Sequence, residues 1–266
     1  MSHIVFDIGG THLRVARLES GAPSEAQKIE TPASPDEAFT ALVALAGRVA
    51  GGTVDGISGG VAGVIGKDGT VLSSPNLPEW NGFPLARKLS ERFSAPAFLH
   101  NDSDLAGLGE ALFGAGQGAR IVAHLRLGTG VGGTRIVEGE IDDHAQGFEP
   151  GHQVVELSTG ASLESLIGGA ALRKKYGMPP PKLSPEIWKE LTPALAIGIW
   201  NAIVHWSPDI VVLGGSLFDG PLAFQLDEVR ASVEQCRRVL PTVPPIVLGT
   251  LDDRAGLYGA AALLPK

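Results

Sequence analysis

The stretch that decides the fold is DIGGTHLR, residues 7–14, which directly follows the apolar triplet Ile4-Val5-Phe6. The triplet predicts a buried strand. An acid at the end of that strand must be solvated, hydrogen-bonded or close to a cation, because burying a lone carboxylate is costly. Gly9 and Gly10 let the backbone turn tightly and let a bulky group approach its N–H groups. A plain β-hairpin turn is the alternative interpretation, and the rest of the chain has to decide between the two.

A second glycine turn, GTGVGG at residues 128–133, also lies between two strand-like segments. It matches G-x-G-x-x-G, but a dinucleotide site requires a helix directly after the glycines, and residues 134–141 alternate like a strand. We therefore reject the dinucleotide site. A glycine hairpin can still bind phosphate through successive N–H groups. We therefore predict that the two turns bind the β- and γ-phosphates of a nucleotide. Asp7 would hold a hydrated Mg²⁺ ion, and the Thr11 hydroxyl would donate to a phosphate oxygen.

Both halves of the chain open with a strand, a glycine turn and a strand, which suggests an internal duplication of the fold. We place the boundary near Ala115–Ala119, giving domains 1–116 and 117–266, and allow the last helix, near 255–266, to pack back on the first domain. Helices are expected at residues 35–51, 84–93, 103–114, 162–177, 183–206, 221–236 and 255–264, and strands at 4–10, 13–20, 27–32, 55–66, 70–76, 96–102, 209–216 and 245–251. Residues 119–141 are expected to form a strand, a glycine turn and a second strand.

The composition indicates a globular protein and argues against some classes of binding partner. The chain has 266 residues, 44% of them hydrophobic, which suffices for a large core. Its net charge of −8 repels phosphate backbones and anionic lipid, so we expect neither nucleic acid nor membrane as partner. Cys236 is the single cysteine and is interpreted as a small apolar filler. The sequence opens without a signal-peptide pattern, from which we expect a cytoplasmic protein.

Six motifs together resemble the ROK sugar kinases of the actin-like ATPase superfamily, in the order that family has them. They are DIGGTHLR (7–14), SPNLPEWNGFPL (74–85), HNDSDLAGLGEALFG (100–114), LGTGVGG (127–133), EPGH (149–152) and DIVVLGGS (209–216). Each is weak alone, but six in order over nearly the whole chain are specific. The resemblance implies an α/β, two-domain actin-like ATPase (ribonuclease H-like) fold with a catalytic cleft between the domains.

The resemblance also implies the activity: an ATP-dependent, glucokinase-like kinase that phosphorylates a hydroxyl of a hexose or N-acetylhexosamine, requires Mg²⁺ and forms a homodimer. Nucleotide-binding residues would be Gly9, Gly10, Thr11, Gly128, Thr129, Gly130, Gly132 and, on the adenosine side, Gly214 and Gly215.

By the same resemblance, Asp102 is the general base that takes the proton from the sugar hydroxyl, and Asn101 orients the sugar. The alternative is that Asp102 or Ser103 caps the helix that begins there. Capping is compatible with catalysis, because a helix N-terminus keeps a carboxylate ionised.

The remaining sugar-binding residues implied by the resemblance are Asn76, Glu149, His152 and Glu164. Each has a simpler interpretation beside it. Asn76 is equally well a turn residue, and His152 a satisfied core or surface histidine. Glu164 fits a capping box for a helix capped at Ala161 or Ser162.

One departure concerns metal. ROK proteins commonly carry a cysteine cluster that binds structural zinc between the EPGH histidine and the later glutamate. Here that stretch is QVVELSTGASLE, residues 153–164, without a cysteine. We expect no structural zinc, and the sequence leaves open what orients His152 and which sugar is bound.

Three further classes of protein compete with the kinase. ROK repressors carry a helix-turn-helix domain before the first strand, whereas this chain opens on that strand and is acidic. A sugar-binding protein without catalysis is the second class, and an actin-like ATPase that acts without a sugar is the third. Asp7, Asp102 and both glycine turns favour catalysis, and the HND and EPGH motifs favour a sugar.

Overall fold

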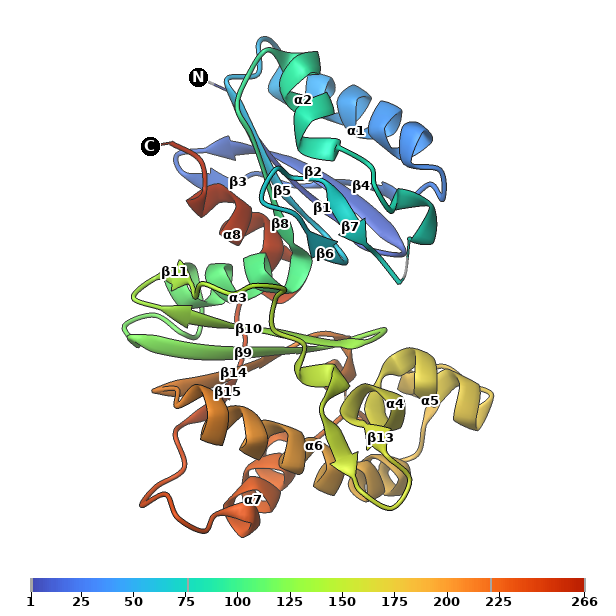
Figure 1. Cartoon of the computed structure of the whole chain (residues 1–266), viewed down its shortest axis with the longest axis vertical. Coiled ribbons are helices and arrows are strands. Elements are labelled where there is room, and N and C mark those ends of the chain that lie inside the picture. Colours follow the sequence, from blue (N-terminus) through green and yellow to red (C-terminus); the bar gives the residue numbers. More distant parts are fainter. Residues whose placement is uncertain (1, 76, 221, 266) are drawn as a thin grey trace. The chain divides into compact units, whose positions relative to one another are not determined.

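The computed structural model describes residues 2–75, 77–220 and 222–265, so Asn76 lies outside the described residues. By its internal contacts the chain divides into two compact units (Figure 1). Unit 1 comprises Met1–Gly109 and Arg254–Lys266, and unit 2 comprises Glu110–Asp253.

The central sheet of unit 1 has the strand order β3-β2-β1-β5-β8, with β4 also paired to β2. Strands β1 and β2 form an antiparallel hairpin around the first glycine turn, whereas β5 and β8 run parallel to β1. The bounds are β1 (His3–Ile8), β2 (His12–Glu19), β3 (Ala22–Pro23), β4 (Gln27–Glu30), β5 (Gly56–Val61) and β8 (Ala97–Asn101), and a separate ribbon pairs β6 (Val64–Ile65) with β7 (Val71–Ser73).

Helices α1 (Pro35–Ala50) and α2 (Leu85–Phe93) cover one face of this sheet, and α8 (Ala255–Ala262) covers the other (Figure 1). Helix α1 begins where the side chain of Ser34 accepts from the Glu37 N–H, and it ends at Gly51, whose φ of 63° suits glycine. The sheet and its helices enclose a core that includes the fully buried Phe6 and Trp80.

Helix α8 packs closely on α3 (Asp102–Phe113) through two glycines. A Cβ on Gly109 would lie 2.1 Å from the Ala255 carbonyl oxygen, and one on Gly259 would lie 1.9 Å from that of Leu105. The small residues of the last helix therefore allow backbone-to-backbone contact in unit 1.

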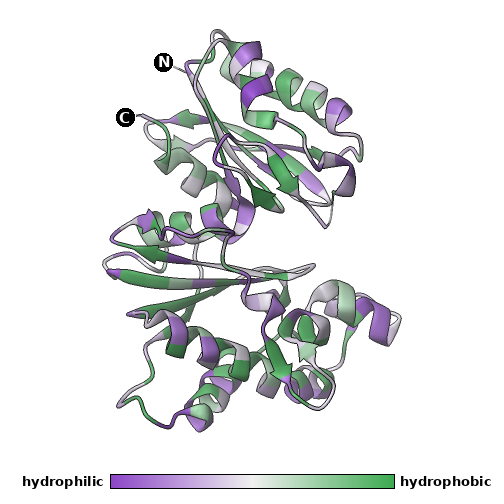
Figure 2. Cartoon of the chain, viewed as in Figure 1, coloured by the Kyte–Doolittle hydropathy of each residue, from purple (hydrophilic) through white to green (hydrophobic). Residues whose placement is uncertain are grey.

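Unit 2 repeats the plan of unit 1, with the strand order β11-β10-β9-β14-β15. Strands β9 and β10 form the antiparallel hairpin around the second glycine turn, and β14 and β15 continue the sheet in parallel. Figure 2 shows β14 coloured as hydrophobic, as expected for a strand buried on both faces. The bounds are β9 (Ile121–Leu127), β10 (Val131–Val137), β11 (Glu140–Ile141), β14 (Ile210–Gly214) and β15 (Ile246–Leu248).

The remaining elements of unit 2 are mostly helical. They are the 3₁₀ turns η2 (Pro150–His152), η3 (Pro180–Lys182) and η4 (Ser216–Phe218), the hairpin β12 (Val154–Glu156) and β13 (Ala161–Ser162), and the helices α4 (Leu163–Ile167), α5 (Gly169–Tyr176), α6 (Pro185–Trp206) and α7 (Leu226–Cys236). A further 3₁₀ turn, η5 (Asp252–Arg254), spans the boundary with unit 1. No helix among the described residues is both long and apolar enough to span a membrane.

Two predicted helices of unit 2 are corrected. The helix expected over 162–177 is broken at Gly168, whose N–H closes α4 on the Glu164 carbonyl while its extended backbone starts α5. The helix expected from residue 221 begins only at Leu226. Just before it, Phe224 is buried, its N–H donates to the Leu217 carbonyl, and its ring lies 4.8 Å from that of Trp188, so packing overrides the helical pattern.

Candidate active site

In unit 1, the two acids singled out from the sequence lie at the same edge of the sheet. Strands β1, β5 and β8 are parallel and end together, with Ile8 beside Val61 and Val61 beside Asn101. Gly60 of β5 pairs with Asp7, and a Cβ on Gly60 would lie 3.1 Å from the Cα of Asp102. The carboxyl ends of parallel strands, where α/β proteins bind ligands, therefore carry both Asp7 and Asp102.

Asp7 is buried, with 6% of its surface exposed, and it pairs with Arg14 across the hairpin. Arg14 Nη1 lies 3.2 Å from Asp7 Oδ2. This cation compensates the cost of burying the carboxylate. Sequence reasoning missed Arg14, although a hairpin centred on the glycine turn sets residue 14 opposite residue 7.

The first glycine turn is fixed from within unit 1. The Gly9 N–H donates to the His12 carbonyl over 3.0 Å, and the Thr31 hydroxyl donates to the Gly9 carbonyl over 2.7 Å. Gly10 and Thr11 are exposed at its tip. A Cβ on Gly9 would meet only the His12 oxygen, at 3.6 Å, so packing within the protein does not require glycine there.

The alternative that Asp102 or Ser103 caps helix α3 is wrong, because Asn101 makes the capping bonds. Its Oδ1 accepts from the N–H groups of Ser103 (2.7 Å) and Asp104 (3.2 Å), and its Nδ2 donates to the Gly63 carbonyl over 2.8 Å. Asn101 thereby fixes the start of the helix that carries the half-buried Asp102.

In unit 2, the second glycine turn is held by the start of α5. The N–H groups of Gly169 and Ala170 each donate over 2.9 Å, to the carbonyls of Gly128 and Thr129 respectively. Inside the turn, the Gly128 N–H donates to the Gly130 carbonyl, also over 2.9 Å. The turn is thus rigidly placed, with Gly128 and Gly130 half-buried and Thr129 exposed.

Glu164 contacts this turn. Its Oε2 accepts a 2.7 Å hydrogen bond from the Val131 N–H, and a Cβ on Gly130 would lie 2.4 Å from the same oxygen. The capping-box alternative is therefore wrong: Ser162 does cap α4, accepting from the Ser165 N–H, but Glu164 contacts the turn instead of the helix start.

The turn that carries Glu149 and His152 lies against the same residue of β10. A Cβ on Gly151 would come within 2.1 Å of the Val131 carbonyl oxygen, so only glycine permits this approach. Glu149 and His152 are both exposed, so His152 is not a core histidine. The structure thus brings Glu164, and the backbone of the turn that carries Glu149 and His152, to the second glycine turn.

The turn after β14 completes this group. Gly215 has a φ of 95°, and a Cβ there would lie 2.3 Å from the Leu127 carbonyl oxygen, directly before the second glycine turn. A Cβ on Gly128 would lie 4.0 Å from Ser216 Oγ. The two predicted nucleotide motifs of unit 2, 128–133 and 214–215, are therefore neighbours.

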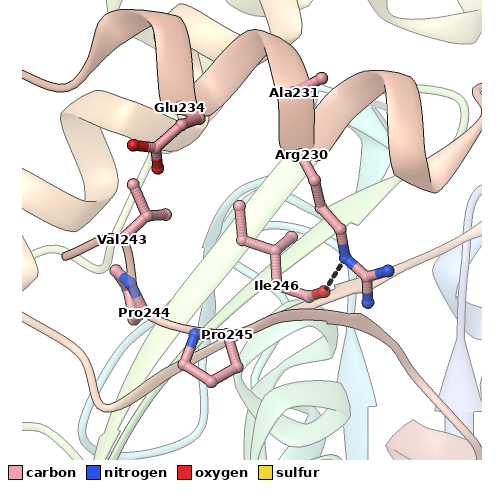
Figure 3. Close-up of a pocket in the computed structure, with 7 residues that line it drawn as sticks. All are labelled: Arg230, Ala231, Glu234, Val243, Pro244, Pro245 and Ile246. Carbon is pink, nitrogen blue, oxygen red and sulfur yellow. Dashed lines mark hydrogen bonds between the residues drawn. The ribbon is translucent and has the colours of Figure 1, made fainter.

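A surface groove elsewhere in unit 2, of about 480 Å³, lies between α7 and the segment before β15 (Figure 3). Arg230 crosses it, and its Nε donates to the Ile246 carbonyl over 2.8 Å. None of the residues described as lining it was predicted as a site residue, so it is separate from the candidate active site.

The segment between His152 and Glu164 does not fit a structural zinc site. It forms the β12–β13 hairpin, and its Glu156 carboxylate is hydrogen-bonded to the Thr159 hydroxyl over 2.6 Å. Across residues 2–75, 77–220 and 222–265, no cluster of three or more His, Cys, Asp or Glu could hold a metal. A magnesium ion carried by a nucleotide asks less of the protein, since it retains waters and needs only one or two carboxylates.

The shared plan of the two units, a glycine-turn hairpin followed by parallel strands, is that of the actin-like ATPases. Within that class the chain belongs to the ROK family, whose model matches residues 3–266. The glucokinase of Streptomyces coelicolor is 33% identical over 97% of this chain and 95% of its own length. The crystal structure of a ROK family glucokinase from Streptomyces griseus, in complex with glucose and AMPPNP, matches with a TM-score of 0.83 at 26% identity, covering 99% of both chains.

The family also contains regulators. The xylose repressor of Caldicellulosiruptor bescii is 26% identical over 79% of this chain and 62% of its own length. Family membership therefore defines the fold and a relation to sugar kinases, and the activity of this chain has to be argued from its own residues.

Proposed function

We propose that the protein is an ATP-dependent kinase that phosphorylates a hydroxyl group of a hexose or N-acetylhexosamine, with glucose as the first candidate. The observation that carries the proposal is the placement of Asp7 and Asp102 beside Gly60, at the shared end of β1, β5 and β8. Similarity to a glucokinase, at 33% identity over nearly the full chain, supports it.

Phosphoryl transfer requires alignment, charge neutralisation and a proton acceptor. In the proposed mechanism, Asp102 accepts the proton of the attacking sugar hydroxyl. Asp7 would hold hydrated Mg²⁺, and Arg14, paired with the Asp7 carboxylate across the hairpin, would keep that carboxylate in place. When bound, Mg²⁺ supplies neutralising charge at the nucleotide phosphates.

The nucleotide would be held by backbone groups. In unit 1 these belong to Gly9, Gly10 and Thr11, whose turn is fixed by Thr31 and tolerates a Cβ at Gly9 on steric grounds within the protein. A glycine at a position where the protein itself has room for a side chain supports the approach of an external group. In unit 2, we assign the same task to the glycine turns, namely Gly128, Thr129, Gly130, Gly132, Gly214 and Gly215.

The sugar would be recognised by polar side chains. An amide nitrogen has two N–H bonds, and Asn101 donates one to the Gly63 carbonyl, which leaves the other for a sugar hydroxyl. Glu149, His152 and Glu164 would add acceptors and a donor. The contact of Glu164 with Val131 and the close approach of Gly151 to the same residue support a shared role for them. Asn76, which lies outside the described residues, completes the set.

The test is a coupled assay for ADP release across glucose, mannose, N-acetylglucosamine and N-acetylmannosamine, with and without Mg²⁺. We expect sugar-dependent ADP release with at least one of these sugars. The similarity to a repressor raises a second candidate, a sugar-binding regulator without catalysis. Calorimetric sugar binding without ADP release would favour that candidate, and sugar-independent hydrolysis would favour a plain ATPase.

A further inference from the structure

The side chain of Gln153 joins the turn that carries His152 to helix α6. Its Nε2 donates to the carbonyls of Pro150, over 2.7 Å, and Gly198, over 3.3 Å. Its Oε1 accepts from Asn201 Nδ2 over 2.8 Å. The half-buried amide therefore uses both its donor and its acceptor atoms between two elements of unit 2.

The backbone of Gln153 makes a further connection, since its carbonyl accepts from the Leu163 N–H over 3.0 Å. Leu163 is the first residue of α4 and directly precedes Glu164. One residue thus links the His152 turn, the start of the helix that carries Glu164, and the middle of α6.

We propose that the Gln153–Asn201 amide pair is a positioning device that sets the Glu149–His152 turn for sugar binding. The inference rests on the proposed function. Residues 153–164 contain no cysteine, so no metal bound by cysteines can hold this turn in place. The amide pair would fix the turn instead. Gly151 and Pro150 of the same turn pack against Val131 and Gly133 of β10, and the amide pair adds the hydrogen bonds that join the turn to α6.

If the amide pair positions this turn, its removal should change the KM for sugar but not the KM for ATP. Gln153→Ala removes both bonds to carbonyl groups, and Asn201→Ala removes the bond to Gln153 Oε1. Because small displacements of positioning groups are costly, each variant is expected to raise the sugar KM about tenfold to 100-fold. The ATP KM is expected to stay within about twofold, since the contacts of Gly169 and Ala170 with the second glycine turn are retained. If the two amides act through one bond, the double variant is no worse than the poorer single variant.

The matched control is Gln117→Ala. Gln117 is an exposed glutamine of the same unit whose Nε2 donates to the Leu112 carbonyl over 2.9 Å, and its loss is expected to change neither KM. Asn201→Ala is the milder variant if Gln153→Ala folds poorly, since it leaves both carbonyl bonds of Gln153 intact. Equal rises in sugar and ATP KM with a lowered melting temperature in both variants would overturn the positioning role, as would an unchanged sugar KM.

Hydrogen exchange separates this inference from the proposed function. In the wild type the His152 N–H donates to the Glu149 carbonyl over 3.1 Å. We expect faster exchange in a peptide spanning residues 149–156 for Gln153→Ala and no change for Gln117→Ala. This readout requires no activity, so an inactive wild type would refute the kinase while leaving the positioning device testable. Unchanged exchange would overturn the positioning device itself.

Discussion

The Glu164 carboxylate accepts a 2.7 Å hydrogen bond from the backbone N–H of Val131, in the second glycine turn. A residue proposed to recognise the sugar is therefore bonded to a turn proposed to hold phosphate. Glu164→Ala should consequently raise the KM for sugar and for ATP together, each about tenfold, because the Val131 N–H loses a charged acceptor. Steady-state kinetics with Ser165→Ala as control would show it. A rise in the sugar KM alone would mean that the bond does not couple the two substrates.

The two glycine turns should respond differently to an added methyl group. Gly9→Ala meets no atom closer than 3.6 Å, whereas a Cβ on Gly130 would lie 2.4 Å from Glu164 Oε2. Gly9→Ala should therefore melt like the wild type and yet lose ATP affinity, because the methyl group occupies space that the phosphates need. Gly130→Ala should weaken the binding of both sugar and ATP, because the added methyl group displaces the Glu164 carboxylate. Nucleotide titrations and thermal melts distinguish the two, and unchanged ATP affinity in Gly9→Ala would make the first turn a structural hairpin only.

The Asp7–Arg14 pair should matter for stability as well as for activity. Arg14→Met leaves a carboxylate that is 6% exposed beside an apolar side chain. Breaking a buried pair in this way costs about 3 kcal/mol of unfolding free energy. Adding Asp7→Asn to Arg14→Met should recover part of that loss in urea unfolding while turnover stays low. If the double variant is less stable than Arg14→Met, the charge of Asp7 is not what Arg14 compensates.

Burial of His124 predicts a specific acid sensitivity. Desolvation, reinforced by Arg126, lowers the pKa of His124 from 6.5 to about 3. Above pH 6.5 the imidazole is neutral in both folded and unfolded states and adds no pH dependence. Between pH 6.5 and about 3 the unfolded state binds a proton that the folded state does not, so stability falls by up to about 1.4 kcal/mol per pH unit.

Urea unfolding at pH 7, 6 and 5 measures this slope. His124→Gln should flatten it, whereas His205→Gln, at an exposed position of α6, should leave it unchanged. An identical slope in the wild type and His124→Gln would assign the acid sensitivity to other groups.

The sequence predicts well those features that depend on residues close to one another in the chain. An apolar strand, an acid and two glycines indicate the β1–β2 hairpin, and a strand followed by a glycine turn likewise indicates β9–β10. Alternation also excludes a helix after residue 133, and the structure has strand β10 there.

The features that the sequence does not predict depend on contacts between distant segments. Glu164 has the spacing of a capping residue, and only tertiary packing brings its carboxylate to Val131. Asp102 and Ser103 are plausible caps by residue type, and only the structure shows that Asn101, the last residue of β8, makes the capping bonds of α3. The role of Gln153 requires knowing that η2 and α6 are adjacent.

The most direct test of the central claim is Asp102→Asn. The substitution keeps size and polarity but removes the proton acceptor, so kcat should fall on the order of 10²–10⁴-fold. Sugar affinity, measured by calorimetry on the same preparation, should stay close to that of the wild type. A kcat near the wild-type value, with ADP release still dependent on the sugar, would contradict the assignment of Asp102 as the catalytic base.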